Sequence, residues 1–314
     1  MSMIAFGPVP SRRLGRSLGI NNIPPKVCTY SCVYCQLGRT NRMRASRQDF
    51  FQTSDILKAA EEKVEEAKHG GEPIDYLAFV PDGEPTLDLN LGSSIRALQG
   101  LSIPVAVVTN SSLLYLPQVR QELLEADWVS VKVDSVRESS WRAVDRPHGG
   151  LSLASVLRGV EAFAREFSGE LQTETMLVAG FNDGEEDLRA TAEFLGRLKP
   201  AKANISIPTR PPAEERVRPP GERVLSSAYG IFKEALPRVE ILSGYEGDAF
   251  ACSGDVRQDI LSITAVHPMR ESAVRKTLAG AGARWEVVVE LLESGQLVEV
   301  EYKGHRYYLR PIAT

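Results

Sequence analysis

Short β-rich runs alternate with amphipathic helical patterns through most of this chain, and no other feature of the sequence restricts the fold so strongly. Six runs have the composition and length of strands: 76–81 (YLAFVP), 105–109 (VAVVT), 128–133 (WVSVKV), 173–178 (TETMLV), 204–209 (NISIPT) and 239–242 (VEIL). Between them, helical segments place apolar residues on one stripe. Strands and helices in alternation form right-handed crossovers and a parallel sheet. The sequence therefore predicts an α/β fold with functional loops at the C-terminal ends of the strands.

The pattern changes after residue 254. Residues 255–314 contain short helical segments, followed by the strands 298–302 and 305–309 around Lys303-Gly304, which is the pattern of a hairpin. Helices followed by a small hairpin are typical of a winged-helix-like α+β module. We therefore predict two domains, residues 1–250 and residues 255–314.

Composition limits the environment and the partners. The 314 residues are 43% hydrophobic and 25% charged, as in ordinary globular proteins. The sequence has no apolar run near twenty residues and no signal-peptide order at its start, so we expect a cytoplasmic protein without a membrane partner. The 37 basic and 41 acidic side chains give no general signal for polyanion binding.

Three of the four cysteines lie within eight residues, Cys28, Cys32 and Cys35 of CTYSCVYC, and the fourth, Cys252, is 217 residues further on. In a reducing compartment, clustered thiols indicate a metal or catalysis rather than disulfides. A closed zinc site needs four ligands and usually two CxxC pairs, and the sequence has no second pair. Three thiols instead match a four-iron cluster in which one iron keeps an open coordination position.

The cysteine segment lies in a positively charged stretch. Between Arg12 and Arg47 the sequence has eight basic residues and no acidic ones. The stretch is either a solvated basic loop or a surface that faces an anionic cluster, cofactor or phosphate.

The segment CTYSCVYC resembles the cluster motif of the radical S-adenosylmethionine (SAM) superfamily. The resemblance implies a partial parallel (β/α)6 barrel that holds a 4Fe-4S cluster and SAM. In that family, SAM chelates the unique iron, and one electron from the reduced cluster cleaves the sulfonium to give a 5′-deoxyadenosyl radical that abstracts hydrogen from the substrate. The implied partner is an electron donor such as flavodoxin or ferredoxin.

In this superfamily the next strand ends in a Gly-Gly-Glu-like turn that receives the methionyl ammonium of SAM. The matching residues here are Asp82, Gly83 and Glu84, so an aspartate replaces the first glycine. By resemblance, Gly83 offers close backbone approach and Glu84 a carboxylate, and Tyr34 matches the aromatic position beside the adenine. Without the cysteines, the same turn reads equally as a turn followed by a helix cap.

Polar residues that follow later strands are further candidates. Thr109 and Asn110 match positions that commonly meet the carboxylate or ribose of SAM. Lys132 and Asp134 would lie at the same mouth, where they contact substrate or form a buried ion pair.

The strand 204–209 adds the last candidates. Ile205 and Ile207 share one face, where the superfamily packs the adenine, although core residues need no such role. Arg210 is either an anion clamp for SAM or substrate, or a surface residue.

A narrower resemblance rests on GPVPSRRLGRSLGINNIPPKVC, CVYCQLG, VDRPHGG and SITAVHPMR, which resemble the wyosine-synthase-like radical SAM oxidoreductases. The wyosine enzyme, which acts on tRNA, is expected to carry a second cluster on three further cysteines, and this chain has only Cys252 to spare. The substrate therefore stays open among a peptide or protein, a small molecule and a tRNA base, with an anionic substrate compatible with the basic stretch.

A different class also fits part of the sequence: a metal-binding regulatory protein without catalytic activity, whose winged-helix-like module binds DNA. Residues 255–314 carry eight basic and eight acidic side chains, which is not the charge of a nucleic-acid face.

Overall fold

The computed structural model describes residues 4–242, 255–266 and 268–311. Its main element is an eight-stranded sheet in the order β1-β2-β5-β6-β7-β8-β9-β10. The strands are β1 (Ala5–Ser11), β2 (Gly15–Ile20), β5 (Tyr76–Phe79), β6 (Val105–Thr109), β7 (Trp128–Lys132), β8 (Glu170–Met176), β9 (Lys202–Ser206) and β10 (Val239–Leu242). Every neighbouring pair is parallel except β1 and β2. This arrangement confirms the predicted α/β fold with a mostly parallel, partial barrel.

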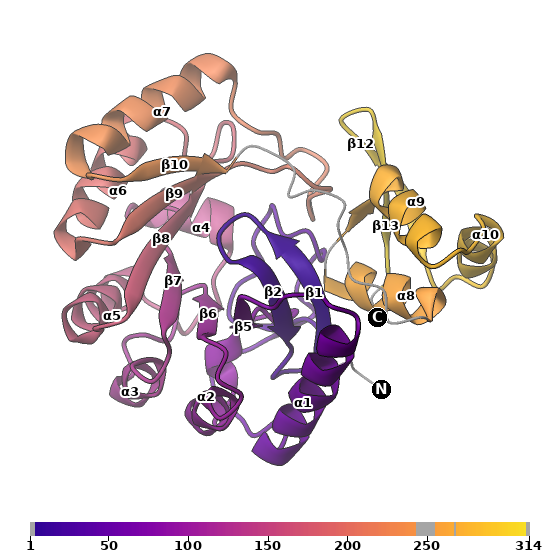
Figure 1. Cartoon of the computed structure of the whole chain (residues 1–314). Helices are drawn as coiled ribbons and strands as arrows, with labels where there is room; N and C mark the ends of the chain where they lie inside the picture. The colour runs from indigo at the N-terminus through magenta and orange to yellow at the C-terminus, as the bar shows by residue number, and fades with distance from the viewer. Residues whose placement is uncertain (1–3, 243–254, 267, 312–314) are drawn as a thin grey trace.

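Helices cover the outer face of the curved sheet (Figure 1). They are α1 (Thr53–His69), α2 (Leu91–Gln99), α3 (Pro117–Leu123), α5 (Leu153–Glu166), α6 (Glu185–Leu198) and α7 (Glu222–Ala235). The chain also forms the short 3-10 helix η1 (Pro85–Leu87) after β5 and the helix α4 (Glu138–Asp145) after β7. The apolar stripe of α5, for example, buries Val156, Val160 and Phe163. Because both faces of the parallel strands are covered, a strand such as VAVVT in β6 is apolar throughout rather than alternating.

All six strands expected from the sequence are present. The sheet also contains β1 and β2, an antiparallel hairpin at its edge that the sequence pattern did not reveal. Its residues include Pro8, Pro10 and several glycines, so hydrophobic periodicity is weak there. Arg12, in the turn of this hairpin, donates a 2.6 Å hydrogen bond to the carbonyl of Leu242 at the end of β10. A side chain thus links the two edge regions of the open sheet.

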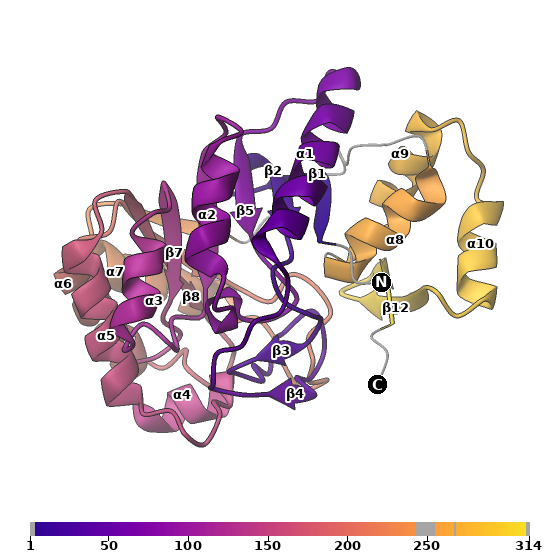
Figure 2. The same ribbon diagram turned by 90° about the horizontal axis from the view of Figure 1, so that it is seen from below.

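The cysteine loop lies between β2 and α1 and contains the two-stranded pair β3 (Val27–Cys28) and β4 (Arg42–Met43). This pair and α4 lie at the same end of the main sheet (Figure 2). Tyr30 forms a β-bridge with Pro147, and the backbone N–H of Val33 donates to the carbonyl of Val144. The loop is therefore fastened to the segment that follows β7.

The C-terminal residues form α8 (Val256–Val266), β11 (Met269–Arg270), α9 (Glu271–Gly280), α10 (Glu286–Glu293), β12 (Val298–Tyr302) and β13 (His305–Leu309). We call these elements the C-terminal module. The predicted hairpin is confirmed: Lys303 and Gly304 form its turn, both with positive φ. The apolar core of the module includes Phe6 and Val9 of β1, and the module lies beside this strand (Figure 1). The division into two domains stays a prediction.

Cys252 and the Gly-rich segment around it lie outside the described residues. None of the helices within the described ranges has the length and apolar character that crossing a membrane requires.

Candidate functional site

A cavity of about 410 Å³ lies where the sequence places the functional loops, at the C-terminal ends of the strands. Its wall combines residues 80–84 after β5, residues 108–110 at the end of β6 and residues 206–210 after β9 with the cysteine loop and the N-terminal hairpin. The parallel arrangement of the strands brings these distant segments to one edge of the sheet.

The three thiols of the cysteine loop, Cys28, Cys32 and Cys35, all line this cavity and none forms a disulfide. Burial raises the pKa of the Cys28 thiol to about 12, and the charge of Glu84 adds to the effect. Burial also raises the pKa of Cys32 well above its usual range, with a further contribution from Asp145. Thiols in such surroundings become thiolate ligands when a bound metal supplies compensating positive charge.

The donor set fits a multinuclear cluster better than a single ion. Among the described residues, no group of three or more His, Cys, Asp or Glu side chains could hold one metal ion. In a four-iron cluster each cysteine binds its own iron, so the thiols need not converge on one point. Three free thiols on one cavity wall meet this requirement.

The turn Asp82-Gly83-Glu84 is joined to the cysteine loop through the backbone. The N–H of Glu84 donates to the carbonyl of Val27 at 3.1 Å, and the N–H of Lys26 donates to the carbonyl of Asp82 at 2.7 Å. A Cβ on Gly83 would lie 1.9 Å from the Val27 oxygen. The close approach expected at Gly83 is therefore made to the chain segment that carries Cys28.

Glu84 is buried, and its carboxylate accepts four hydrogen bonds within the protein. It accepts hydrogen bonds from the hydroxyls of Thr86 and Thr109, both at 2.6 Å, and from the N–H groups of Thr86 and Asn110 at 3.1 and 2.7 Å. Burial raises the pKa of Glu84, and these hydrogen bonds oppose the rise. Glu84 thus ties the end of β5 to the end of β6. Its Oε2 atom accepts only the bond from Asn110 among these four.

Asn110 extends this network to the thiols. Its Nδ2 donates to the hydroxyl of Thr29 at 2.7 Å and lies 3.6 Å from the sulfur of Cys28. Thr109 faces Glu84 through its hydroxyl. The structure therefore brings together the candidates Glu84, Thr109, Asn110 and Cys28.

Lys132 and Asp134 form the buried ion pair that the sequence offered as one alternative, and Glu174 joins them as a partner that the sequence did not predict. The Nζ of Lys132 lies 3.0 Å from Glu174 Oε1, 3.8 Å from Asp134 Oδ1 and 4.9 Å from the ring centre of Tyr34. Burial disfavours the charge on Glu174, but Lys132 and Arg13 outweigh it and lower the pKa of this carboxyl. Lys132 and Glu174 line the cavity.

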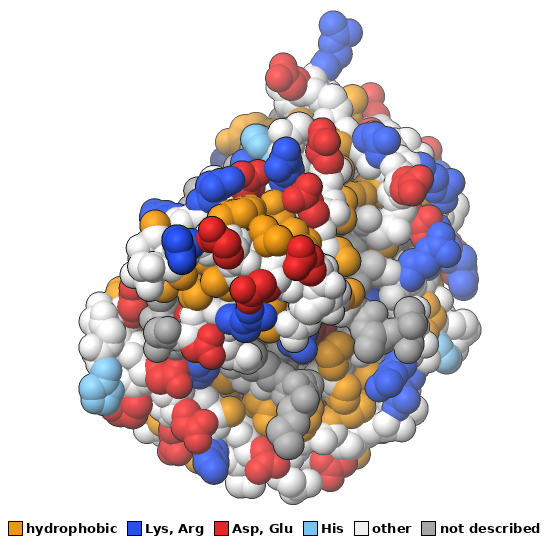
Figure 3. Space-filling model, turned by 90° about the vertical axis from the view of Figure 1, so that its right-hand side faces the viewer, with side chains coloured by type: hydrophobic (Ala, Val, Ile, Leu, Met, Phe, Trp, Pro, Cys, Tyr) orange, Lys and Arg blue, Asp and Glu red, His pale blue; other side chains and the backbone are white. Residues whose placement is uncertain are grey.

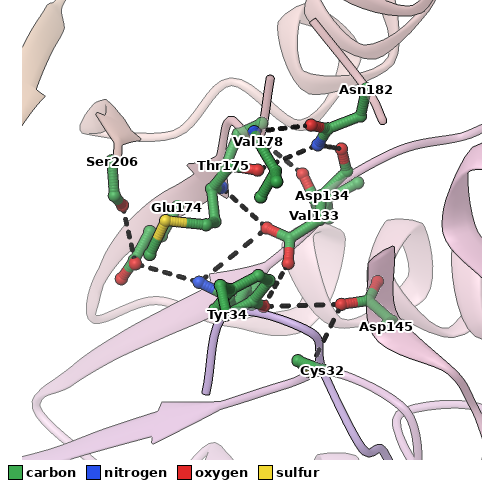
Figure 4. Close-up of polar contacts among 12 residues, drawn as sticks. Cys32, Tyr34, Val133, Asp134, Asp145, Glu174, Thr175, Val178, Asn182 and Ser206 are labelled. Atoms are coloured by element: carbon green, nitrogen blue, oxygen red, sulfur yellow. Dashed lines mark hydrogen bonds and ion pairs between the residues drawn. The ribbon is translucent and has the colours of Figure 1, made fainter. Parts of the chain in front are cut away.

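Tyr34 lines the cavity, as expected for an aromatic beside a bound base, and its hydroxyl is held on the far side. The hydroxyl donates to Asp134 and lies 3.4 Å from Asp145, whose Oδ1 also accepts from the thiol of Cys32 at 3.4 Å (Figure 4). Burial raises the pKa of Asp145, and the neighbouring Asp134 raises it further. These bonds fix the ring of Tyr34 next to Cys32.

The structure places the remaining candidates, Ile205, Ile207 and Arg210, in different surroundings. Ile205 is fully buried in the core of the barrel, whereas Ile207 lines the cavity. Arg210 also lines the cavity, and its guanidinium donates to the side chain of Gln36 in the cysteine loop.

Sequence reasoning missed two charged residues of the site, Asp145 and Glu174, whereas Arg13 and Lys26 belong to the basic stretch that the sequence indicated. Glu174 had a detectable signal, because its strand lies inside a parallel sheet, where an acidic side chain needs a partner. Asp82, regarded only as a departure from a motif, is 5% exposed and lines the cavity. Its Oδ1 has no hydrogen-bond partner within the described part of the chain.

Comparison with known proteins agrees with this geometry. The family model described as the radical SAM superfamily matches residues 22–195, more than half of the chain. A UPF0026 protein of Methanocaldococcus jannaschii is 45% identical over 311 residues, which are 98% of this chain and 96% of that protein.

Two solved structures share the fold at low sequence identity. A radical SAM methyltransferase from Sphaerobacter thermophilus has a TM-score of 0.54 at 13% identity, covering 72% of this chain and 66% of its own. TYW1, solved with a lysine–pyruvate adduct bound, has a TM-score of 0.52 at 14% identity, covering 70% and 74%. The chain belongs to the radical SAM superfamily, and its cofactors are a 4Fe-4S cluster and S-adenosylmethionine.

Proposed function

We propose that the protein is a radical SAM enzyme that removes a hydrogen atom from an anionic substrate bound in the cavity. The observation that carries the proposal is the convergence of Cys28, Cys32 and Cys35 on the cavity wall that also holds Gly83 and Glu84. When bound, the cluster and SAM supply one-electron cleavage of the sulfonium and hydrogen-atom abstraction. The one-electron donor we infer is a small redox protein such as flavodoxin or ferredoxin.

Different residues of the chain would hold the cluster and SAM. Cys28, Cys32 and Cys35 hold the cluster, and Asn110 orients the sulfur of Cys28 by its 3.6 Å contact. Glu84 would receive the methionyl ammonium of SAM at Oε2, which carries one of its four hydrogen bonds, while the other three at Oε1 hold the strand ends in place.

The other wall of the cavity recognises SAM and the substrate. The ring of Tyr34 and the side chain of Ile207 line the cavity and would flank the adenine. Lys132 and Thr109, which line the cavity, would provide polar contacts around the ribose and carboxylate. Asp134 is not part of the cavity lining and holds Lys132 and the hydroxyl of Tyr34 in place. Ile205 supports this wall from the core rather than touching the ligand.

The charge of the cavity supports an anionic substrate. Five cations line it, Arg12, Arg13, Lys26, Lys132 and Arg210. Three acidic residues, Asp82, Glu84 and Glu174, line it as well. Glu174 is bound by Lys132 and Arg13, and Glu84 accepts from four hydrogen-bond donors. Burial raises the pKa of Asp82 to about 7, which favours its neutral form, so little negative charge is left to repel an anion.

Two features bear on the substrate class: the number of cysteines in the chain and the charge of its C-terminal module. We place the protein in the wyosine-synthase-like group on its motifs, but a second cluster on three further cysteines does not fit a chain with one cysteine outside the loop. On the face in Figure 3, acidic and basic side chains are interspersed around an apolar patch. These features favour a small anionic molecule or an acidic peptide over a tRNA base.

The test is anaerobic reconstitution with iron and sulfide, followed by reduction and incubation with SAM. We expect the wild-type protein to produce 5′-deoxyadenosine and methionine, and Cys28→Ala, Cys32→Ala and Cys35→Ala each to lose this product together with bound iron. Cys252→Ala is the matched control, because it removes a thiol outside the loop and should leave both quantities unchanged. Product formation by any of the three loop variants would contradict the ligand assignment.

The regulatory alternative predicts a different outcome of the same experiment. A metal-binding regulator would take up metal and leave SAM intact.

A further inference from the structure

Lys26 is an unusual residue to find in the wall of the cavity. It is 2% exposed, although lysine is almost never fully buried without a charged partner. Its Nζ donates to the carbonyl of Gly38 at 2.6 Å and to the sulfur of Cys35 at 3.5 Å. No salt bridge to an aspartate or glutamate compensates its charge within the described ranges 4–242, 255–266 and 268–311. The charge of Lys26 does act on the nearby buried carboxyl of Asp82, whose pKa it lowers against the larger effect of burial, but the two groups form no salt bridge. A buried ammonium without a directly bound carboxylate is stabilised by further negative charge at its own position.

The backbone holds this side chain in place at some conformational cost. Lys26 has φ of 60°, in the left-handed region that residues with a Cβ seldom adopt. Its N–H is fixed by the carbonyl of Asp82, and the carbonyl of the next residue, Val27, accepts from the N–H of Glu84. Strained residues held by surrounding bonds are concentrated at functional sites. Here the strain directs a cation toward Cys35.

The other cations of the cavity bind different groups. Lys132 is compensated by Glu174 and Asp134. Arg210 donates to Gln36, and Arg12 to the carbonyl of Leu242. Lys26 is the cavity cation for which the described residues show a hydrogen bond to a cysteine of the loop.

A cluster bound by the loop would place further negative charge directly at the sulfur of Cys35, to which Lys26 donates. Three thiolates on a four-iron core carry a net negative charge in the oxidised state, and reduction adds one more. A neighbouring cation stabilises the reduced state more than the oxidised state, since the Coulomb energy scales with the charge it faces. Charge and hydrogen bonds at the sulfurs are among the factors that set the potential of such clusters.

We propose that Lys26 raises the reduction potential of the cluster through its hydrogen bond and charge at Cys35, and so eases electron transfer from a low-potential donor. This inference rests on the proposed function, because it takes Cys35 as a cluster ligand. Lys26 acts as a positioning residue: it touches a ligand of the cluster and not the reacting atoms.

The experiment is an anaerobic redox titration of the reconstituted protein, in which the reduced cluster is followed by electron paramagnetic resonance. Lys26→Met removes the charge at nearly the same length, and Lys26→Arg keeps it. Arg12→Met is the control, since it removes a cation of the same cavity that donates to a carbonyl. Iron and sulfide are measured in every sample.

We expect Lys26→Met to lower the ratio of reduced to oxidised cluster at a fixed potential at least tenfold, which is about 59 mV for a one-electron couple. The midpoint potentials of the clusters in Lys26→Arg and Arg12→Met should differ from that of the wild-type protein by only a small fraction of this shift. An unchanged midpoint potential in Lys26→Met at full iron content would overturn the inference, and so would an equal shift in all three variants.

A second measurement on the wild-type protein covers the case in which Lys26→Met fails to fold or to take up iron. Protein grown on ¹⁵N-lysine should show a ¹⁵N hyperfine coupling in electron–nuclear resonance spectra of the reduced cluster. Lack of this coupling would refute the contact. If the wild-type protein takes up no iron–sulfur cluster, the proposed function fails instead, and the two failures are distinguishable.

Discussion

Gly83 provides the sharpest test of how the site is assembled. In Gly83→Ala, the new Cβ would lie 1.9 Å from the carbonyl oxygen of Val27 and 2.8 Å from its carbonyl carbon. Non-bonded carbon and oxygen atoms need roughly 3.4 Å, so the two backbone segments have to separate by about 1.5 Å. Both are backbone, so no side-chain rotation relieves the clash.

Moving these two backbone segments apart lowers the free energy of unfolding. It breaks the hydrogen bond from Glu84 to Val27 and strains the one from Lys26 to Asp82. Two such bonds contribute about 1–3 kcal/mol together, and overpacking adds about 1–3 kcal/mol. We therefore expect Gly83→Ala to lower the free energy of unfolding by about 2–6 kcal/mol, and to displace Cys28, which directly follows Val27.

Two measurements check this expectation: urea denaturation of the metal-free protein, and iron content after anaerobic reconstitution. Gly149→Ala is the matched control, because a Cβ at Gly149 meets no atom within 4 Å. Gly83→Ala should lose stability and at least half of the bound iron, and Gly149→Ala should lose neither. Wild-type stability and iron content in Gly83→Ala would show that the turn and the cysteine loop are not in the contact described above.

Two further predictions concern the other sides of the cavity. Burial raises the pKa of Asp82 from 3.8 to about 7. Between pH 3.8 and pH 7 the folded protein therefore keeps a proton on Asp82 that the unfolded chain has lost. As a result, the free energy of unfolding falls as the pH rises through this range. Asp82→Asn should remove this part of the pH dependence in urea denaturation between pH 4 and pH 7; an identical slope in both proteins would refute the shift. In the C-terminal module, the hydroxyl of Tyr307 donates to the carbonyl of Thr209 at 3.0 Å, in the cavity wall. The same hydroxyl accepts from Arg270 Nε at 3.0 Å, so Tyr307→Phe loses two hydrogen bonds and should cost about 1–3 kcal/mol of stability. It should also increase hydrogen exchange around Thr209, whereas Tyr308→Phe, which loses a bond to Glu299 within the module, should leave that exchange unchanged. Equal exchange in the two variants would contradict the link between module and cavity.

The main sheet could be predicted because its signal is local. Runs such as VAVVT are buried on both faces, and their composition alone separates them from the amphipathic helices between them. The turn at Lys303-Gly304 was equally readable, because a positive φ there favours glycine. The hairpin of β1 and β2 was not, since β2 depends on pairing with β5, and β1 on pairing with β2, rather than on periodicity of their own.

The site was predictable only in part, for a related reason. The spacing of Cys28, Cys32 and Cys35 is covalent information and indicates the cluster before any folding is considered. The charged partners of the site are contributed by segments far apart in the chain, as Glu174 is to Lys132 and Asp145 is to Cys32. No pattern along the sequence relates such residues.

The sequence by itself determined the strand and helix order, the family and the three thiols, because these depend on residue types at short spacings. Only the tertiary structure decided which side chains face the thiols. It turned Glu84 into a link between two strands, moved Ile205 into the core and set the ammonium of Lys26 beside Cys35. Hydrogen bonds and charges act over a few ångströms in space, and folding alone brings residues from distant parts of the chain within that range.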